Sequence, residues 1–190
     1  MLFLVVKASH IWAQQYGSMV QFIVANQEAQ RLSKIAVFVD VQNIYYTVRQ
    51  AYSCHFNYST FWAELQARGE IVTAYAYAIE RRDQQQVQFQ QILRDIGFEV
   101  KLKPFIQRGD GSAKGDWDVG ITLDILDQAG RVDTLVLASG DGDFDLLLNK
   151  VRKDHQAHVV VYGVPSLTAG SLVRAASDFR PIEGTLLLAR

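Results

Sequence analysis

From residue 34 onward, short apolar runs alternate with longer segments of mixed character. Five of the runs are almost continuously apolar, which is the pattern of a strand that is covered on both faces of a parallel sheet. They cover residues 35–39, 75–79, 98–102, 134–138 and 158–162. The pattern therefore predicts five buried strands.

Four segments between these runs have the periodicity or the boundaries of helices, namely residues 43–51, 84–96, 118–129 and 144–151. Segment 84–96 repeats apolar residues at i, i+3, i+4 and i+7 and ends before Gly97, a typical helix stop. In segment 118–129 the apolar stripe is predicted to consist of Val119, Leu123 and Leu126.

Strand and helix alternate about five times, which predicts an α/β fold with helices on both faces of a parallel sheet. We expect a three-layer α/β/α domain over residues 34–190 with a mainly parallel sheet of about five strands. The first strand is not followed by Gly-x-Gly-x-x-Gly, so the sequence does not support a dinucleotide-binding fold.

Residues 1–33 differ from the rest of the chain and are interpreted as an N-terminal appendage. They contain only three charged residues, Lys7, Glu28 and Arg31. The apolar run 2–6 is shorter than the roughly 7–15 residues of a signal-peptide core, and no run approaches the roughly 18 apolar residues of a membrane span. We expect a cytoplasmic protein without a membrane segment, whose apolar N-terminal segment could pack on a second subunit in a homo-oligomer.

Composition narrows the classes of function. The 190 residues are 49% apolar, which excludes a disordered chain, and Cys54 is the one cysteine, which excludes a disulfide scaffold. The formal net charge of −1 excludes a uniformly basic nucleic-acid binder but not a local basic patch. The acidic residues are distributed unevenly, because nine aspartates and no glutamate lie between positions 110 and 145. Aspartate is favoured in caps, turns and metal sites rather than on helix surfaces.

Polar residues follow the predicted strands at points that meet on one edge of the sheet. In open α/β sheets, ligands bind outside the carboxyl ends of the strands, where the following helices also begin. The residues at these points are Asp40, Asn43, Lys114, Asp116, Asp118, Ser139, Asp141, Asp143 and Asp145. Asp124 lies about 9 Å further along its helix at 1.5 Å per residue and is rotated away from Asp118, so it fits this set less well.

Several carboxylates in one cleft repel one another, so they take up protons or bind a cation. Oxygen ligands without convergent histidine or cysteine favour Mg²⁺ or Mn²⁺, and such sites serve nucleases and phosphatases. Each residue also has a structural interpretation. Asp40 could cap the helix that begins near Asn43, Asp143 could cap the helix after it, and Asp124 could be solvated.

Three motifs in order resemble the NYN domain, specifically its LabA-like branch within the PIN-like nuclease group. They are Asp40-Val41-Gln42-Asn43, Lys114-Gly115-Asp116-Trp117-Asp118-Val119 with Asp124, and Ser139-Gly140-Asp141-Gly142-Asp143-Phe144. The resemblance covers roughly residues 34–181. It implies a PIN-like (NYN) fold and a ribonuclease site that depends on Mg²⁺ or Mn²⁺.

The resemblance also implies roles for single residues. The catalytic metal ligands would be Asp40, Asp118, Asp141 and Asp143. Three further residues would serve the substrate or support these ligands: Asn43 would orient Asp40 or touch the substrate, Ser139 would support the last aspartate pair or a phosphate, and Lys114 would meet the charge of the RNA backbone. Asp116 occupies a variable position of its motif and is not an expected ligand.

RNA is the expected partner. Lys101, Lys103, Arg108 and Lys114 form a basic run that could contact phosphates. Trp117, like Phe105, could stack on an unpaired base or be buried in the core.

Two other functions compete with the ribonuclease. A haloacid-dehalogenase-like phosphohydrolase would use Asp40 as its nucleophile, but that family needs an aspartate two residues later, where this chain has Gln42. The other alternative is a PIN-like domain that binds nucleic acid or a protein partner without catalysis.

Overall fold

The computed structural model describes residues 32–80, 84–104, 106–107, 113–114 and 116–188, with the backbone alone for 106–107 and 113–114. The helices are α2 (Val41–Tyr52), α3 (Tyr58–Gln66), α4 (Gln84–Ile96), α5 (Asp118–Ala129), α6 (Asp145–His155) and α7 (Gly170–Ala175). The main sheet contains β1 (Lys34–Asp40), β3 (Glu70–Glu80), β4 (Glu99–Pro104), β7 (Thr134–Ala138), β8 (His158–Gly163) and β9 (Asp178–Pro181). The prediction of a mainly parallel α/β sheet is confirmed.

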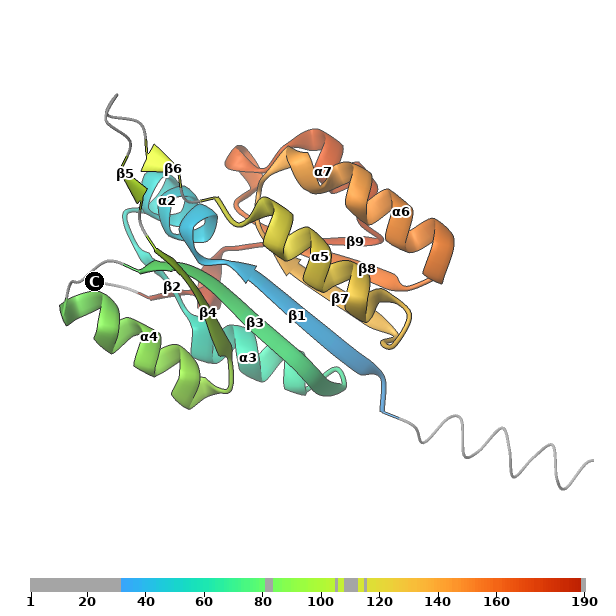
Figure 1. The fold of residues 1–190 in the computed structure, drawn as a ribbon, viewed down its shortest axis with the longest axis horizontal. Coiled ribbons are helices and arrows are strands. Elements are labelled where there is room, and N and C mark those ends of the chain that lie inside the picture. The colour runs from blue at the N-terminus through green and yellow to red at the C-terminus, as the bar shows by residue number, and fades with distance from the viewer. Residues whose placement is uncertain (1–31, 81–83, 105, 108–112, 115, 189–190) are drawn as a thin grey trace, which may run out of the picture. The chain divides into compact units, whose positions relative to one another are not determined.

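The six strands lie in the order β4-β3-β1-β7-β8-β9, and every neighbouring pair is parallel (Figure 1). Numbered along the chain, the strands of this sheet follow the doubly wound order 3-2-1-4-5-6. The order reverses between β1 and β7, and the crevice at the carboxyl ends of two such strands is where ligands bind in this architecture. The topology therefore predicts a ligand site at the carboxyl ends of β1 and β7.

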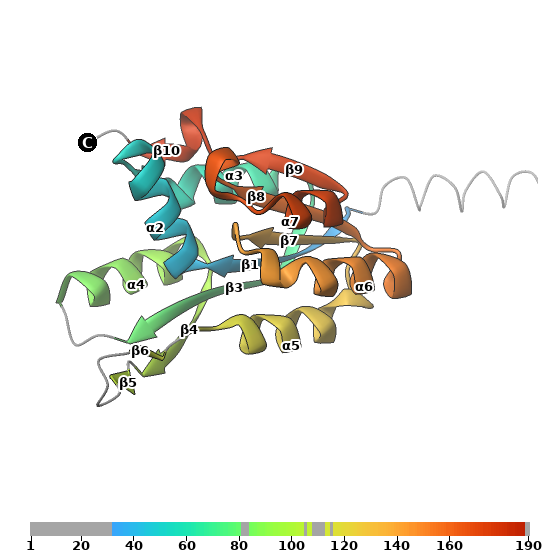
Figure 2. The same ribbon diagram turned by 90° about the horizontal axis from the view of Figure 1, so that it is seen from above.

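Helices cover both faces of the sheet and enclose two separate cores (Figures 1 and 2). Side chains alternate along β1, so Val37 and Val39 enter one core while Ala36 and Phe38 enter the other. The first core includes residues of α2, α3 and α4, and the second includes residues of α5, α6 and α7. The three-layer α/β/α arrangement expected from the sequence is confirmed.

Two predicted details are wrong. In α5 the buried residues are Ile121, Ile125 and Ala129, whereas Val119 and Leu123 of the predicted stripe are 69% and 59% exposed and its third member, Leu126, is partly buried against the second core. The helix carries apolar residues on two stripes, and the sheet buries the other one. Residues 98–102 do not form a strand covered on both faces, because β4 is an edge strand with no fully buried residue.

Several elements lie outside the predicted set. They are α3, α7, β9 and two small antiparallel sheets, in which β2 (His55–Phe56) pairs with β10 (Leu187–Leu188) and β5 (Ile106–Gln107) pairs with β6 (Ala113–Lys114). Within the described residues, no helix is both long and apolar enough to cross a bilayer. Residues 1–31 lie outside the description, so the appendage and its proposed role in oligomerisation stay predictions.

Candidate metal centre

Asp40 is the last residue of β1 and caps the helix that follows it. Its Oδ1 accepts a hydrogen bond from the backbone N–H of Asn43 at 3.1 Å, so the structural interpretation of Asp40 as a helix cap is confirmed. Its Oδ2 accepts from the hydroxyl of Ser139 at 3.4 Å. Because Val39 pairs with Ala138, Asp40 and Ser139 extend from neighbouring strands at the reversal of strand order. One carboxylate thus joins the ends of the two strands.

The loop after β7 presents two more aspartates. The buried Ser139 hydroxyl accepts from the backbone N–H of Asp141 at 3.2 Å, and Asp141 in turn accepts from the N–H of Asp143 at 3.0 Å. Asp141, rather than the predicted Asp143, is therefore the cap at this point. The side-chain oxygen of Asn43 accepts from the N–H of Gly140 at 2.9 Å, so Asn43 contacts Asp40 through its backbone and this loop through its side chain.

Gly140 allows this loop to pack closely against the segment before α7. A Cβ built at position 140 would lie 2.8 Å from the carbonyl oxygen of Leu167, which is too close for a side chain. The N–H of Ala169 also donates to the carbonyl oxygen of Gly140 at 3.0 Å. Backbone contacts therefore fix the loop that carries Asp141 and Asp143.

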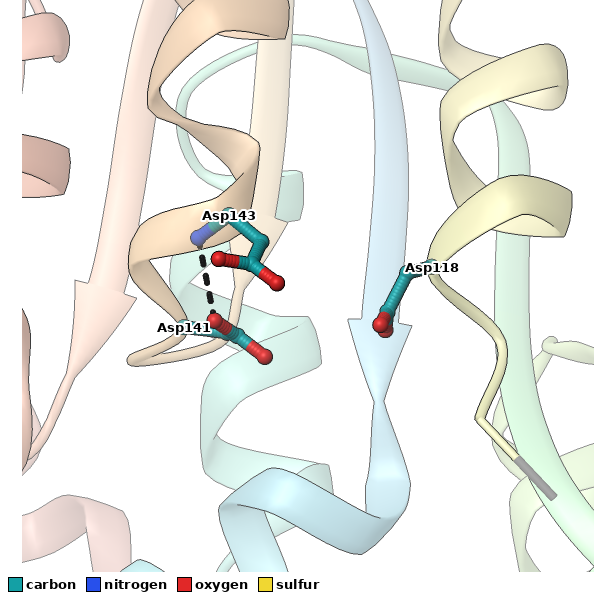
Figure 3. A group of neighbouring side chains, drawn as sticks. All are labelled: Asp118, Asp141 and Asp143. Atoms are coloured by element: carbon teal, nitrogen blue, oxygen red, sulfur yellow. Dashed lines mark hydrogen bonds between the residues drawn. The ribbon is translucent and has the colours of Figure 1, made fainter. Parts of the chain in front are cut away.

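Asp118 reaches the same place from the start of α5. Asp118, Asp141 and Asp143 each offer a carboxylate oxygen, and these oxygens lie within 4.8 Å of one another. Figure 3 shows Asp141 and Asp143 on one side of the end of β1 and Asp118 on the other. The fold thus brings Asp118 to two aspartates that lie more than twenty positions further along the sequence.

Mutual repulsion and burial make the charged form of these carboxylates unfavourable. Burial, with a contribution from the negative charges of Asp118 and Asp141, raises the pKa of Asp40 to about 6. The pKa of Asp118 is raised as well, first by burial and then by Asp141, Asp116 and Asp143. A cation at the cluster would relieve both effects.

The donor set fits a hard divalent cation. The three converging groups are carboxylates, and histidine and cysteine are absent from this cluster of described residues. Oxygen donors of this kind suit Mg²⁺ or Mn²⁺, and Mg²⁺ commonly keeps several waters while it binds only a few carboxylates. Asp40 lies beside the cluster but outside the three-residue set.

The basic run splits into residues with different roles. Lys101 is engaged in an ion pair with Asp124 at 2.7 Å. The ammonium group of Lys103 donates to the carbonyl oxygen of Asp116 at 2.8 Å, and its positive charge counteracts the rise in the pKa of Asp118. Of Lys114 only the backbone is described, paired with Ile106, so the predicted contact with RNA lies outside the described part of the chain.

The side chains of Trp117 and Asp124 are partly buried and make structural contacts. Trp117 is partly buried against the second core and donates its indole N–H to the carbonyl oxygen of Ala78 at 2.9 Å, which favours a structural role for its ring. Asp124 is partly buried rather than fully solvated, and it accepts hydrogen bonds from Tyr77 and Lys101. In the sequence, the contact between Lys101 and Asp124 is indicated by the position of Lys101, which alternates with the apolar residues Val100 and Leu102 on an edge strand. Phe105 and Arg108 lie outside the description.

Comparison with known proteins identifies relatives over most of the chain. The NYN domain model matches residues 34–183. The low amplitude and bright protein LabA of Synechococcus elongatus is 30% identical over 160 residues, which cover 78% of this chain and 82% of that protein. The crystal structure of a protein of unknown function from Vibrio parahaemolyticus is 52% identical, covers 84% of this chain and 98% of its own, and superposes with a TM-score of 0.80.

Proposed function

This chain belongs to the NYN domain family, whose members are nucleases, and from that premise we propose that it is a ribonuclease dependent on Mg²⁺ or Mn²⁺. The observation that carries the proposal is the convergence of Asp118, Asp141 and Asp143 within 4.8 Å. The cluster lies at the carboxyl ends of parallel strands, where this architecture binds ligands. The reaction would be hydrolysis of a phosphodiester bond of RNA.

In this proposal Asp40, Asp118, Asp141 and Asp143 hold the cation. A bound divalent cation would supply positive charge that lowers the pKa of a water molecule and stabilises the leaving oxygen. The protein's contribution is to hold these carboxylates in fixed positions around the cation. Ser139 supports this arrangement because its hydroxyl contacts both Asp40 and the backbone of Asp141. Asn43 keeps the Gly140 turn in place.

Lys103 supplies a positively charged ammonium group next to the carboxylates, where it can bind the RNA backbone. Its ammonium group lies 5.2 Å from the centroid of the Trp117 ring and donates to the carbonyl oxygen of Asp116. An ammonium group has three donors, so it can keep this contact and still bind a phosphate oxygen. We place Lys103 in the substrate path, with Lys114 as the second phosphate contact expected from the family resemblance.

A panel of matched oligonucleotides tests the proposal. Single- and double-stranded RNA and DNA of one sequence are incubated with the full chain in Mg²⁺, in Mn²⁺ and in excess EDTA. We expect RNA to be cleaved with either metal and to stay intact in EDTA. Equal cleavage of RNA in EDTA would refute the metal dependence, and cleavage of DNA alone would refute the assignment to RNA.

The two alternatives differ from this outcome in specific ways. Tight RNA binding with no cleavage under any metal would favour a non-catalytic PIN-like domain. The phosphohydrolase alternative is left without support, because the NYN model matches residues 34–183 and Gln42 occupies the position where that family needs a second aspartate.

A further inference from the structure

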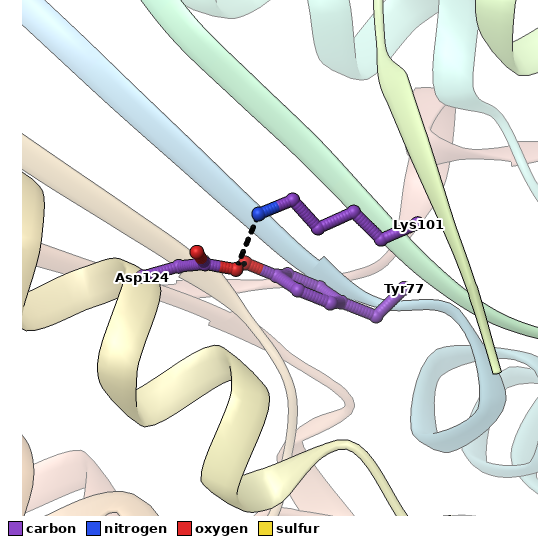
Figure 4. Close-up of polar contacts among 3 residues, drawn as sticks. All are labelled: Tyr77, Lys101 and Asp124. Atoms are coloured by element: carbon purple, nitrogen blue, oxygen red, sulfur yellow. Dashed lines mark hydrogen bonds and ion pairs between the residues drawn. The ribbon is translucent and has the colours of Figure 1, made fainter.

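A second carboxylate on α5 ties three elements together at one oxygen atom. Oδ2 of Asp124 accepts a hydrogen bond from the hydroxyl of Tyr77 on β3 at 2.7 Å and another from the ammonium group of Lys101 on β4 at 2.7 Å (Figure 4). Asp124 follows Asp118 by six residues on the same helix, or about 9 Å at 1.5 Å per residue. The contact therefore holds the helix that begins with a residue of the acidic cluster.

This contact is sheltered from solvent. The side chains of Lys101 and Asp124 are 24% and 23% exposed, and the ammonium nitrogen lies 3.8 Å from the centroid of the Tyr75 ring. Short hydrogen bonds between charged groups are stronger than neutral ones, and exposed ion pairs contribute little. The Lys150–Asp154 pair on α6 is an exposed pair of the second kind, with side chains that are 59% and 39% exposed.

The start of α5 has no side-chain cap that would define its position. Its N-cap residue is Trp117, which makes no capping hydrogen bond. Instead, the Trp117 indole donates to the carbonyl oxygen of Ala78, and its ring lies 5.3 Å from the Tyr77 ring. Tyr77 thus contacts α5 twice, through its ring at Trp117 and through its hydroxyl at Asp124. Both contacts relate the helix start to β3.

Apolar packing alone specifies the position of α5 less strictly. The helix is buried through Ile121, Ile125 and Ala129, while Val119 and Leu123 face solvent. Apolar contacts are not directional, whereas a hydrogen bond requires a particular distance and angle. The directional contact at Asp124 is therefore suited to set the rotation of α5 about its own axis and its displacement along the sheet.

We propose that Asp124, held by Tyr77 and Lys101, is a positioning residue that keeps the carboxylate of Asp118 within reach of Asp141 and Asp143. Asp124 itself does not touch the substrate or the cation. The inference rests on the proposed function in one respect, namely that the cluster binds a divalent cation. Lys101 has a structural role in this scheme, which distinguishes it from Lys103.

The test compares Mn²⁺ affinity among variants of the full chain by electron paramagnetic resonance. Changes in residues that orient metal ligands typically weaken metal binding by roughly 10- to 100-fold. We expect Asp124→Asn to weaken Mn²⁺ binding by about 10-fold and Tyr77→Phe and Lys101→Met to act in the same direction. Lys101→Arg, which keeps the charge, should recover part of the loss. The double variant Asp124→Asn with Lys101→Met should weaken Mn²⁺ binding by less than the product of the two single fold-changes.

Asp154→Asn is the matched control, because it makes the same chemical change in the exposed ion pair of α6. We expect this control to bind Mn²⁺ like the unaltered chain. If Asp124→Asn lowers the melting temperature but leaves the Mn²⁺ affinity at the value of Asp154→Asn, the contact serves stability alone and the positioning role is refuted.

Amide hydrogen exchange without metal separates this proposal from the proposed function. Asp124→Asn should increase exchange of the amides from Ile121 to Ile125, with amides of α4 unchanged, and unaltered exchange in α5 would refute the positioning role. If the unaltered chain binds no Mn²⁺ and cleaves no RNA, the metal-dependent function fails, while the exchange experiment still decides whether Asp124 holds the start of α5.

Discussion

Two groups of interactions act on the pKa of Asp40 in opposite directions. It accepts hydrogen bonds from Asn43 and Ser139, which favour its charged form, yet burial and the neighbouring aspartates raise its pKa to about 6. The folded protein therefore binds a proton at Asp40 more tightly than the unfolded chain does. Without metal, this residue's favourable contribution to stability is fully present below pH 3.8 and is lost as the pH rises through about 6.

Replacement of Asp40 by asparagine should remove that loss. We expect metal-free Asp40→Asn to be more stable than the unaltered chain at pH 7.5, by about 1–3 kcal/mol, and the difference to shrink as the pH falls toward 4. Urea unfolding at a series of pH values in EDTA measures this directly. A difference that grows on acidification would contradict the assigned cause. In the unaltered chain, Mn²⁺ should bind more tightly as the pH rises through about 6, because protons compete with the metal.

Lys103 should affect RNA binding more than folding. We expect Lys103→Met to weaken the binding of single-stranded RNA and to reduce the slope of log affinity against log salt by about 0.7, the value for one lost phosphate contact. Lys153→Met changes an exposed lysine of α6 and is the control. Fluorescence anisotropy in Ca²⁺ across a salt series measures both. Equal slopes for the two variants would remove Lys103 from the substrate path.

At the scale of elements, the sequence predicts the bounds of α5 but not which of its faces is buried. The bounds 118–129 follow from the preceding polar loop and from Gly130, and the structure confirms them. The buried face does not follow, because Val119 and Leu123 are as apolar as Ile121 and Ile125. Only the sheet decides which stripe is covered. The contact of Asp124 on α5 with Tyr77 on β3 and Lys101 on β4 depends on the relative register of these three elements, which local sequence does not encode.

A pair of substitutions on α5 measures this choice of face. Ile125 is fully buried and Leu123 is 59% exposed. We expect Ile125→Ala to destabilise the protein by about 2–4 kcal/mol, because it leaves a cavity, and Leu123→Ala to cost less than about 1 kcal/mol. Chemical denaturation of both variants gives the two values. A larger loss at Leu123 would show that the stripe of Val119 and Leu123 is the buried one.

Across the whole molecule, the strand order explains why distant aspartates meet. The alternation of apolar runs with helices predicts a parallel sheet, and the order β4-β3-β1-β7-β8-β9 then places the ends of β1 and β7 side by side. Sequence reasoning places Asp40, Asp118, Asp141 and Asp143 at strand ends or helix starts, so a common edge follows. It does not yield β9, whose residues Asp178–Pro181 contain no apolar run. The net charge of −1 is the sum over 19 basic and 20 acidic residues, so it does not reveal the acidic cluster or the lysines beside it.

The central claim, that the aspartate cluster supports metal-dependent cleavage of RNA, is tested most directly by metal add-back. The full chain, Asp141→Asn and Asp127→Asn are stripped with EDTA, and cleavage of single-stranded RNA is then followed as Mn²⁺ is restored. Asp127 is an exposed residue of α5, so its variant controls for the loss of a carboxylate. The account predicts that activity returns in the unaltered chain and in Asp127→Asn but falls by at least about 100-fold in Asp141→Asn, with its melting temperature nearly unchanged. Equal recovery of all three proteins would contradict it.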